Sequence, residues 1–279
     1  MSSPLISIVV AVFNGAQTIQ KCIDSIQSQD FKNFELIVID GESTDSTCEI
    51  LHGNKNVISY MISESDRGIS DAWNKGVSQA KGEWIYFLGA DDYLWDSKVL
   101  SAVANELQNP PLNTLVAYGK VAVVNEDYQE LVRAGRPWHL VSNSFKGLMV
   151  LPHQGIFHHH TLFKTYGYFD EQFRIVADYE FLLRYLKSNA ATFFPTITVA
   201  GMLHGGLSSQ AVSSLRLLRE VRLAQKKCGL NIPQWNWILA MMRVRFRLLL
   251  TSILGERLTY KVLDQIRGVA KQPRFWTKL

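Results

Sequence analysis

Two adjacent carboxylates, Asp91 and Asp92, directly follow Gly89 and Ala90 at the end of an apolar run over residues 84–88. A short run of bulky apolar residues is typical of a buried parallel strand, and ligands in open α/β sheets bind beyond the carboxyl ends of such strands. Adjacent carboxylates repel each other unless a hard divalent cation neutralises them. The pair therefore predicts a metal site that binds a phosphate-bearing substrate. The alternative is a loop in which Asp92 caps the next helix.

Alternating apolar and helical segments in the first hundred residues indicate what positions this pair. Strands are expected at residues 5–12, 34–39, 57–62 and 84–88. Between the first two strands, apolar residues recur with the period of a helix that buries one face: Ile19, Cys22, Ile23 and Ile26. Ser70 is expected to cap the helix before the fourth strand. Such alternation predicts a doubly wound α/β sheet with right-handed crossovers.

The pattern changes after the break at residues 109–111. Short strands are expected at 115–124, 131–134 and 155–158, then a helix at 178–188, a strand at 192–202, and helices at 211–227 and 234–254. This order predicts a mixed extension of the sheet. The consecutive histidines His158, His159 and His160 are interpreted as polar residues at the end of a loop.

Composition narrows the class of protein. The 279 residues are 47% hydrophobic, which suffices for a large core. The three cysteines form no CxxC pair, so neither a disulfide framework nor a zinc site is indicated and a reducing compartment is expected. We recognise no secretory signal and no apolar stretch of membrane-spanning length.

The net charge of +4 conceals an asymmetry. Residues 211–279 carry 14 Lys and Arg against 3 Asp and Glu, a net charge of +11, whereas residues 1–210 carry 15 against 22, a net charge of −7. An acidic body with a basic tail indicates an anionic surface as the partner of the tail.

Five segments, taken in order, resemble the motifs of family-2 glycosyltransferases, which are inverting enzymes with the GT-A fold. They are residues 7–14 (SIVVAVFN), 34–45 (FELIVIDGESTD), 63–76 (SESDRGISDAWNKG), 89–92 (GADD) and 169–184. The fourth lies at the position of the family's DxD-type metal motif, and the fifth resembles its catalytic-base helix. The subgroup most resembled builds bacterial exopolysaccharide, such as colanic acid, or O-antigen. The resemblance implies a GT-A-like doubly wound mixed sheet in residues 1–210, and the charge and helical spacing of residues 211–279 predict a basic helical C-terminal extension.

The resemblance also implies a nucleotide-sugar donor, UDP- or GDP-linked. The donor-binding residues that it implies are Phe13, Asn14, Asp40, Asp66 and Asp91. The first three are expected at the base, Asp66 at the base or ribose, and Asp91 at the ribose or behind the metal. Asp40 and Asp66 are also ordinary turn residues. Many relatives have a second Asp where this chain has Gly41, which leaves the choice of nucleotide open.

Metal and base roles follow from the same resemblance. Asp92 is the implied ligand of Mn²⁺ or Mg²⁺, which would stabilise the departing nucleoside diphosphate. His204 is either a third ligand or a structural histidine. Asp178 is the implied general base, because inversion needs a carboxylate opposite the leaving group. Asp178 also lies where an N-cap is expected, so capping competes with catalysis, and Glu180 is the fallback base.

The acceptor side carries a weaker pattern. His153 and Gln154 resemble an HQ pair of the subgroup and are expected near the acceptor, a saccharide that is lipid-linked in our interpretation. Lys75 is interpreted as a solvated helix lysine, with an added positive charge at the site as the alternative.

The tail lies outside the matching segments. Basic residues at helical spacing are Arg216, Arg219, Arg222 and Lys226, and a second helix places Trp235 and Trp237 before Arg243, Arg245 and Arg247. Aromatic and basic residues together favour an anionic membrane surface, so a cytoplasmic protein peripheral to the inner face of the plasma membrane is expected. The alternatives are a packed helical appendage or a contact in a homo-oligomer. No motif supports a nucleic-acid partner.

Two other functions compete. A nucleotidyltransferase also uses carboxylates and a metal on a related sheet, but its basic phosphate loop has no counterpart here, because no Lys or Arg precedes Lys21. A non-catalytic sugar-nucleotide-binding module would not need both Asp92 and Asp178.

Overall fold

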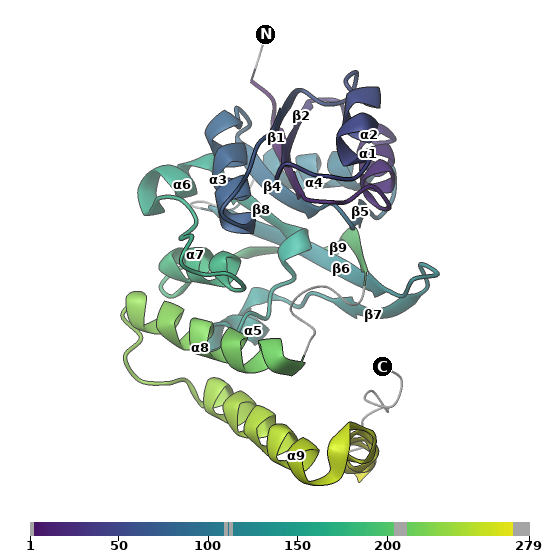
Figure 1. Ribbon diagram of the computed structural model, residues 1–279. Coiled ribbons are helices and arrows are strands. Elements are labelled where there is room, and N and C mark those ends of the chain that lie inside the picture. The colour runs from purple at the N-terminus through teal and green to yellow at the C-terminus, as the bar shows by residue number, and fades with distance from the viewer. Residues whose placement is uncertain (1–2, 109–110, 112–113, 204–210, 270–279) are drawn as a thin grey trace.

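A computed structural model describes residues 3–108, 111, 114–203 and 211–269. In this part of the chain, nine strands form one sheet in the order β3-β2-β1-β4-β8-β6-β9-β5, with β7 paired to β6. Helices cover both faces of the sheet (Figure 1). The mixed, doubly wound α/β architecture expected from the sequence is confirmed.

The first half of the sheet is parallel. Its strands are β1 (Ile6–Val12), β2 (Phe34–Asp40), β3 (Tyr60–Ser63) and β4 (Trp84–Gly89), and its helices are α1 (Ile19–Gln27), α2 (Thr47–Gly53) and α3 (Ile69–Gln79). All seven residues of β1 are buried, because this strand lies between β2 and β4 and is covered on both faces. Its side chains alternate: Val9 packs in the core that includes α3, and Val10 in the core that includes α1.

The register of these strands brings their carboxyl ends together. Val12 pairs with Asp40, Asp40 pairs with Ser63, and Ala11 pairs with Gly89. The loops that follow the four strands therefore meet at one edge of the sheet, where ligands bind in open α/β folds.

The second half is built from shorter elements. They are β5 (Tyr93–Leu94), α4 (Val99–Gln108), β6 (Val116–Val124), β7 (Glu130–Ala134), α5 (Trp138–Phe145), the 3₁₀ turn η1 (His153–Gly155), β8 (Ile156–His159), α6 (His160–Tyr166), α7 (Ala177–Leu186) and β9 (Thr192–Leu203). Strand β8 runs antiparallel between β4 and β6, which makes the sheet mixed. The sequence missed β5, α5 and α6 because each has eight residues or fewer and shows too little periodicity.

Three local expectations were wrong. β3 begins at Tyr60, because the backbone N–H groups of residues 57 and 58 donate to Asn54 in a turn. Gly68, not Ser70, stands at the N-cap of α3, and its φ of 118° suits glycine. His158 is not a loop residue: it lies in β8 and is 1% exposed.

The C-terminal extension comprises α8 (Ala211–Lys227) and α9 (Trp235–Val269). Val221 and Ala224 of α8 and Cys228 after it pack in the same core as α7, and the domain division after residue 210 stays a prediction. Gly255, with φ of 73°, interrupts α9 close to its expected end. Among the described residues, no helix combines the length and apolarity needed to cross a membrane.

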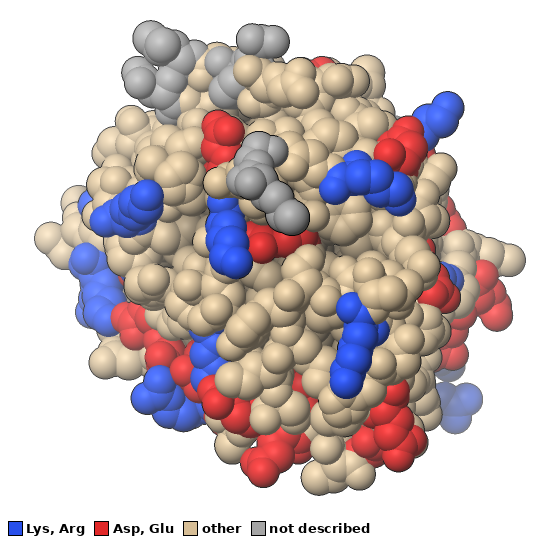
Figure 2. Space-filling view, turned by 90° about the horizontal axis from the view of Figure 1, so that it is seen from above, with Lys and Arg blue, Asp and Glu red and all other residues tan. Residues whose placement is uncertain are grey.

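Charge is mixed over the face seen from above the sheet. Figure 2 shows acidic and basic side chains interspersed there, without a large field of either sign. The excess of basic residues belongs to residues 211–279, and the helices of this segment that the structure describes lie below the sheet in Figure 1.

Candidate active site

The carboxylates of Asp91 and Asp92 fold back over the end of β4. A Cβ placed on Gly89 would lie 2.5 Å from Asp92 Oδ2 and 2.9 Å from Asp91 Oδ1, so oxygens of both side chains share the space that glycine leaves. Asp91 is exposed, whereas Asp92 is 2% exposed and accepts a hydrogen bond from the backbone N–H of Leu203 at 3.3 Å. The capping alternative for Asp92 is wrong, since this hydrogen bond comes from β9 and not from a helix.

Burial gives Asp92 unusual electrostatics. Its pKa rises to about 7, because burial disfavours the charged form and the neighbouring Asp91 repels it. Hydrogen bonds from Leu203 and from the Gln154 side chain oppose this rise in pKa. The pKa values of the Cys22 thiol and the Tyr86 phenol near Asp92 are also raised, mainly by burial and to a smaller extent by the charge of Asp92.

These features fit a divalent cation. Two neighbouring carboxylates that repel each other, one of them buried, are stabilised when a cation lies between their oxygens, and oxygen is the ligand that Mn²⁺ and Mg²⁺ prefer. Within the described ranges, no three His, Cys, Asp or Glu side chains converge as a complete metal site. Asp91 and Asp92 would thus hold the ion with oxygens from substrate and water. The third candidate, His204, lies outside the described residues.

The loops after β1 and β2 are tied together beside this pair. The backbone N–H of Asn14 donates to Ser43 Oγ at 2.8 Å, and Asn14 Oδ1 accepts from the backbone N–H of Thr44 at 2.8 Å. Asn14 adopts a φ of 50°, a conformation that asparagine tolerates better than most residues. The loops after β1 and β2 are therefore held as one unit.

Asp40 stabilises the second of these loops from inside. Its carboxylate is fully buried and accepts hydrogen bonds from the backbone N–H of Ser43 at 3.0 Å, from Ser63 Oγ at 2.5 Å and from Cys48 Sγ at 3.2 Å. Burial alone would raise its pKa, but these bonds together lower it. Its role at the nucleotide base stays a prediction.

Phe13 and Asp66 face each other across Gly41. A Cβ on Gly41 would lie 2.5 Å from Asp66 Oδ2 and 3.5 Å from the Cβ of Phe13. The phenylalanine ring is 62% exposed, and Asp66 is held by the backbone N–H of Gly68, which donates to Oδ1 at 2.8 Å. Glycine at position 41 thus leaves room for the Asp66 carboxylate, next to an open aromatic face.

The turn η1 lies close to Asp92 and within the electrostatic reach of Asp178. Gln154 contacts Asp92, and the Tyr86 hydroxyl donates to the Gln154 carbonyl at 2.8 Å. Next to it, the His153 ring packs 4.9 Å from the Trp73 ring. The pKa of His153 is lowered by burial, while the charge of Asp178 acts to raise it. One turn therefore holds a residue that contacts Asp92 and a residue whose pKa responds to the charge of Asp178. The acceptor role predicted for both residues is untested, and the sequence did not reveal the contact of Gln154 with Asp92.

Asp178 lies in the first turn of α7, half-buried. The N-cap of this helix is Val176, so the expectation that Asp178 occupies the cap was wrong. Its Oδ1 accepts a hydrogen bond from the backbone N–H of Tyr179 at 2.7 Å. Glu180, the fallback base, is 3% exposed and is paired with Arg184, whose Nε donates to it at 3.0 Å. Asp178 is consequently the more available carboxylate of the two.

Contacts from distant segments hold the loop before α7. Glu220 of α8 accepts from the backbone N–H groups of Arg174 and Ile175 at 3.0 and 2.9 Å. Arg67, next to Asp66, pairs with Glu171 of that loop at 3.0 Å. Lys75 is likewise paired, with Glu64 at 2.9 Å, rather than solvated.

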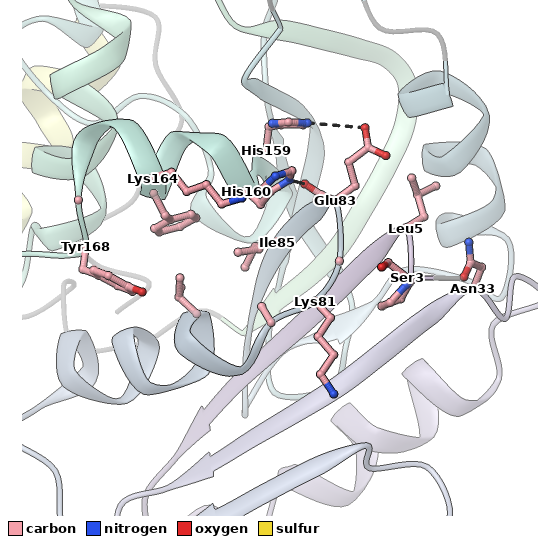
Figure 3. Close-up of a pocket in the computed structure, with 16 residues that line it drawn as sticks. Ser3, Leu5, Asn33, Lys81, Glu83, Ile85, His159, His160, Lys164 and Tyr168 are labelled. Atoms are coloured by element: carbon pink, nitrogen blue, oxygen red, sulfur yellow. Dashed lines mark hydrogen bonds and ion pairs between the residues drawn. The ribbon is translucent and has the colours of Figure 1, made fainter. Parts of the chain in front are cut away.

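A separate cavity of about 890 Å³ lies at the opposite edge of the sheet. It is lined by residues at the starts of β1 and β4 and by α6, including Leu5, Glu83 and Lys164 (Figure 3). Within it, His159 Nε2 lies 3.6 Å from Glu83 Oε1, and His160 Nδ1 lies 3.1 Å from the Glu83 carbonyl. Because it opens beside the amino ends of the strands, this cavity is distinct from the Asp91–Asp92 site.

Comparison with known proteins identifies the family to which this chain belongs. The model for "Glycosyl transferase family 2" matches residues 7–170. A PGL/p-HBAD biosynthesis glycosyltransferase of Mycobacterium tuberculosis is 32% identical over 255 residues, covering 88% of this chain and 96% of the relative.

Solved structures show the same fold. Staphylococcus aureus TarS 1-349 in complex with UDP aligns with a TM-score of 0.58 and 21% identity over 78% of this chain. The present chain spans only 64% of that structure's length. The mannosyltransferase PcManGT of Pyrobaculum calidifontis, in complex with GDP-Man and Mn²⁺, aligns with a TM-score of 0.62 and 16% identity over 97% of this chain and 81% of its own.

Proposed function

Because the chain belongs to glycosyl transferase family 2, we propose that it transfers a sugar from a nucleotide diphosphate to a saccharide hydroxyl with inversion at the anomeric carbon. The observation that carries this proposal is the η1 turn. Its residues lie near both acidic centres, since Gln154 contacts Asp92 and the pKa of His153 responds to the charge of Asp178. With both carboxylates near one turn, leaving-group stabilisation and proton removal can act on the same substrate.

Each residue has a defined part. Asp178 accepts the proton of the acceptor hydroxyl while the oxygen of that hydroxyl bonds to the anomeric carbon. The bond from that carbon to the diphosphate oxygen breaks on the opposite face, and the diphosphate leaves with the electron pair. Asp91 and Asp92 would hold Mn²⁺ or Mg²⁺, which neutralises charge on the leaving diphosphate.

The donor nucleotide occupies the edge where the first loops meet. In this proposal the base stacks on the exposed ring of Phe13 and its N–H donates to Asp66, while Asp40 and Asn14 keep the loops in place. Neighbours of this fold are known with UDP and with GDP-Man, which supports a UDP- or GDP-sugar as donor.

The acceptor in this proposal is a lipid-linked saccharide used for a bacterial surface polysaccharide. The supporting observation is the basic extension, which suits an enzyme that works at the inner face of the plasma membrane.

A pair of variants tests the reaction. A panel of nucleotide-sugars, with and without Mn²⁺, identifies the donor by hydrolysis or transfer. Asp178→Asn is expected to keep donor affinity and to lose transfer by about 10²–10⁴-fold, because only proton removal is affected. Asp127→Asn, in an exposed turn, is the matched control. A near-normal transfer rate in Asp178→Asn would remove the base assignment.

A further inference from the structure

The outer face of α9 carries large apolar side chains that are open to solvent. Before the interruption at Gly255 they are Trp235, Met242, Phe246, Leu249 and Ile253, each between 49% and 70% exposed. We term these five residues the apolar seam. At about 100° per residue they all lie within about 40° of one line along the helix. The other side of α9 faces α8 (Figure 1). There, Trp237 Nε1 donates to the Leu218 carbonyl at 2.8 Å.

Two arginines flank the apolar seam. Arg243 and Arg245 are both exposed, and the helical period places them about 80° to either side of it. Arg247 is different: it is 9% exposed and donates to Ser214 Oγ at 3.2 Å. Residues 228–255 contain no Asp or Glu, so no acidic side chain of this segment neutralises the two exposed arginines.

We propose that the apolar seam of α9 binds the surface of an anionic lipid bilayer. The apolar side chains would enter the boundary between headgroups and acyl chains, and Arg243 and Arg245 would extend along the helix sides to lipid phosphates. A second copy of this chain fits the seam less well, because seam-to-seam packing would bring like-charged arginines together without acidic partners. This interface does not depend on the sugar-transfer reaction.

Vesicle co-sedimentation of the full chain tests the interface. The probes are vesicles of phosphatidylglycerol mixed with phosphatidylcholine, and vesicles of phosphatidylcholine alone. Phe246→Glu/Leu249→Glu is expected to weaken binding to the mixed vesicles by about tenfold or more. Arg243→Gln/Arg245→Gln is expected to weaken binding to mixed vesicles by about tenfold and to leave binding to phosphatidylcholine unchanged.

Leu131→Glu/Val132→Glu is the matched control, since both residues are exposed on β7 and the added charge is the same. The control is expected to bind vesicles as the wild type does. Equal losses in seam and control variants would show only a net-charge effect and overturn the proposal. The proposal would also be overturned if the wild type did not bind vesicles. The same holds if light scattering showed the wild type to be a dimer that the seam variant dissociates.

Discussion

Replacing Asp92 with asparagine is expected to stabilise the metal-free protein at neutral and alkaline pH. The carboxylate is 2% exposed and lies beside Asp91, so its charge is both desolvated and repelled. Asparagine has nearly the same shape, and its oxygen can still accept the hydrogen bond from the backbone N–H of Leu203. The variant therefore removes the unfavourable charge with little change in packing.

The size of the effect follows from the pKa of Asp92, which is about 7 in the fold against an ordinary value of 3.8. Because the folded state holds this proton more tightly than the unfolded chain, the contribution of Asp92 to the free energy of unfolding is largest below about pH 4 and is lost as the pH rises to about 7. Full ionisation costs the metal-free fold about 4 kcal/mol at about 1.4 kcal/mol per pKa unit. Between about pH 5 and pH 8, about 2–3 kcal/mol of this cost develops.

Urea unfolding with a chelator present measures this effect. The difference in unfolding free energy between Asp92→Asn and wild type should grow by about 2–3 kcal/mol from about pH 5 to pH 8. Asp127→Asn should show no such growth, because Asp127 is exposed. Under the proposed function, Mn²⁺ should stabilise the wild type and not Asp92→Asn, and the variant should lose transfer.

One result would refute the reasoning. If the difference between Asp92→Asn and wild type stays constant over this pH range, Asp92 ionises in the fold as it does in water. Burial and the charge of Asp91 would then not control this carboxylate, and the electrostatic argument for a cation at this position would fail.

Two further substitutions test how distant segments shape the site. Gly41→Ala should raise the KM for the nucleotide-sugar donor several-fold with little change in kcat, because the added Cβ would lie 2.5 Å from Asp66 Oδ2. Gly53→Ala is the control, since a Cβ there meets nothing within 4 Å and should leave this KM unchanged. Equal KM values for the two variants would contradict this account. Glu220→Ala should lower the unfolding free energy by about 1–3 kcal/mol, because it orphans two backbone N–H groups before α7. The exposed Glu106→Ala is its control, and calorimetry or urea unfolding measures both; a loss no larger than that of the control would show that Glu220 does not hold the segment.

Local patterns predicted the parallel half of the sheet well. The four apolar residues of α1 between Ile19 and Ile26 are all buried, as their spacing indicated. The position of Asp91 and Asp92 beyond a strand was also confirmed, since it needs only the end of one apolar run and a general property of parallel sheets. In both cases the information lies within about ten consecutive residues.

The environment of the site could not be predicted in this way. Gln154 reaches Asp92 because β8 runs antiparallel beside β4, with Tyr86 paired to Phe157, and this pairing joins segments about 70 residues apart in sequence. The same strand buries His158, whose Nε2 has no hydrogen-bond partner within the described residues. Burial and His153 lower its pKa to about 3, so a neutral ring serves as a core side chain among aromatic neighbours. The sequence alone does not show which residues will surround a histidine such as His158.

The C-terminal helices show why charge alone predicts an interface poorly. The sequence placed Arg222 and Arg247 among residues facing an anionic surface, yet Arg222 donates to the carbonyl of Leu230 at 2.8 Å and Arg247 to Ser214. A guanidinium that is committed to the protein's own oxygens is less available for lipid phosphates. What stays exposed on α9 is a line of apolar side chains with Arg243 and Arg245 at its edges. Membrane affinity should accordingly respond to the apolar seam and these two arginines more than to the total charge of the extension.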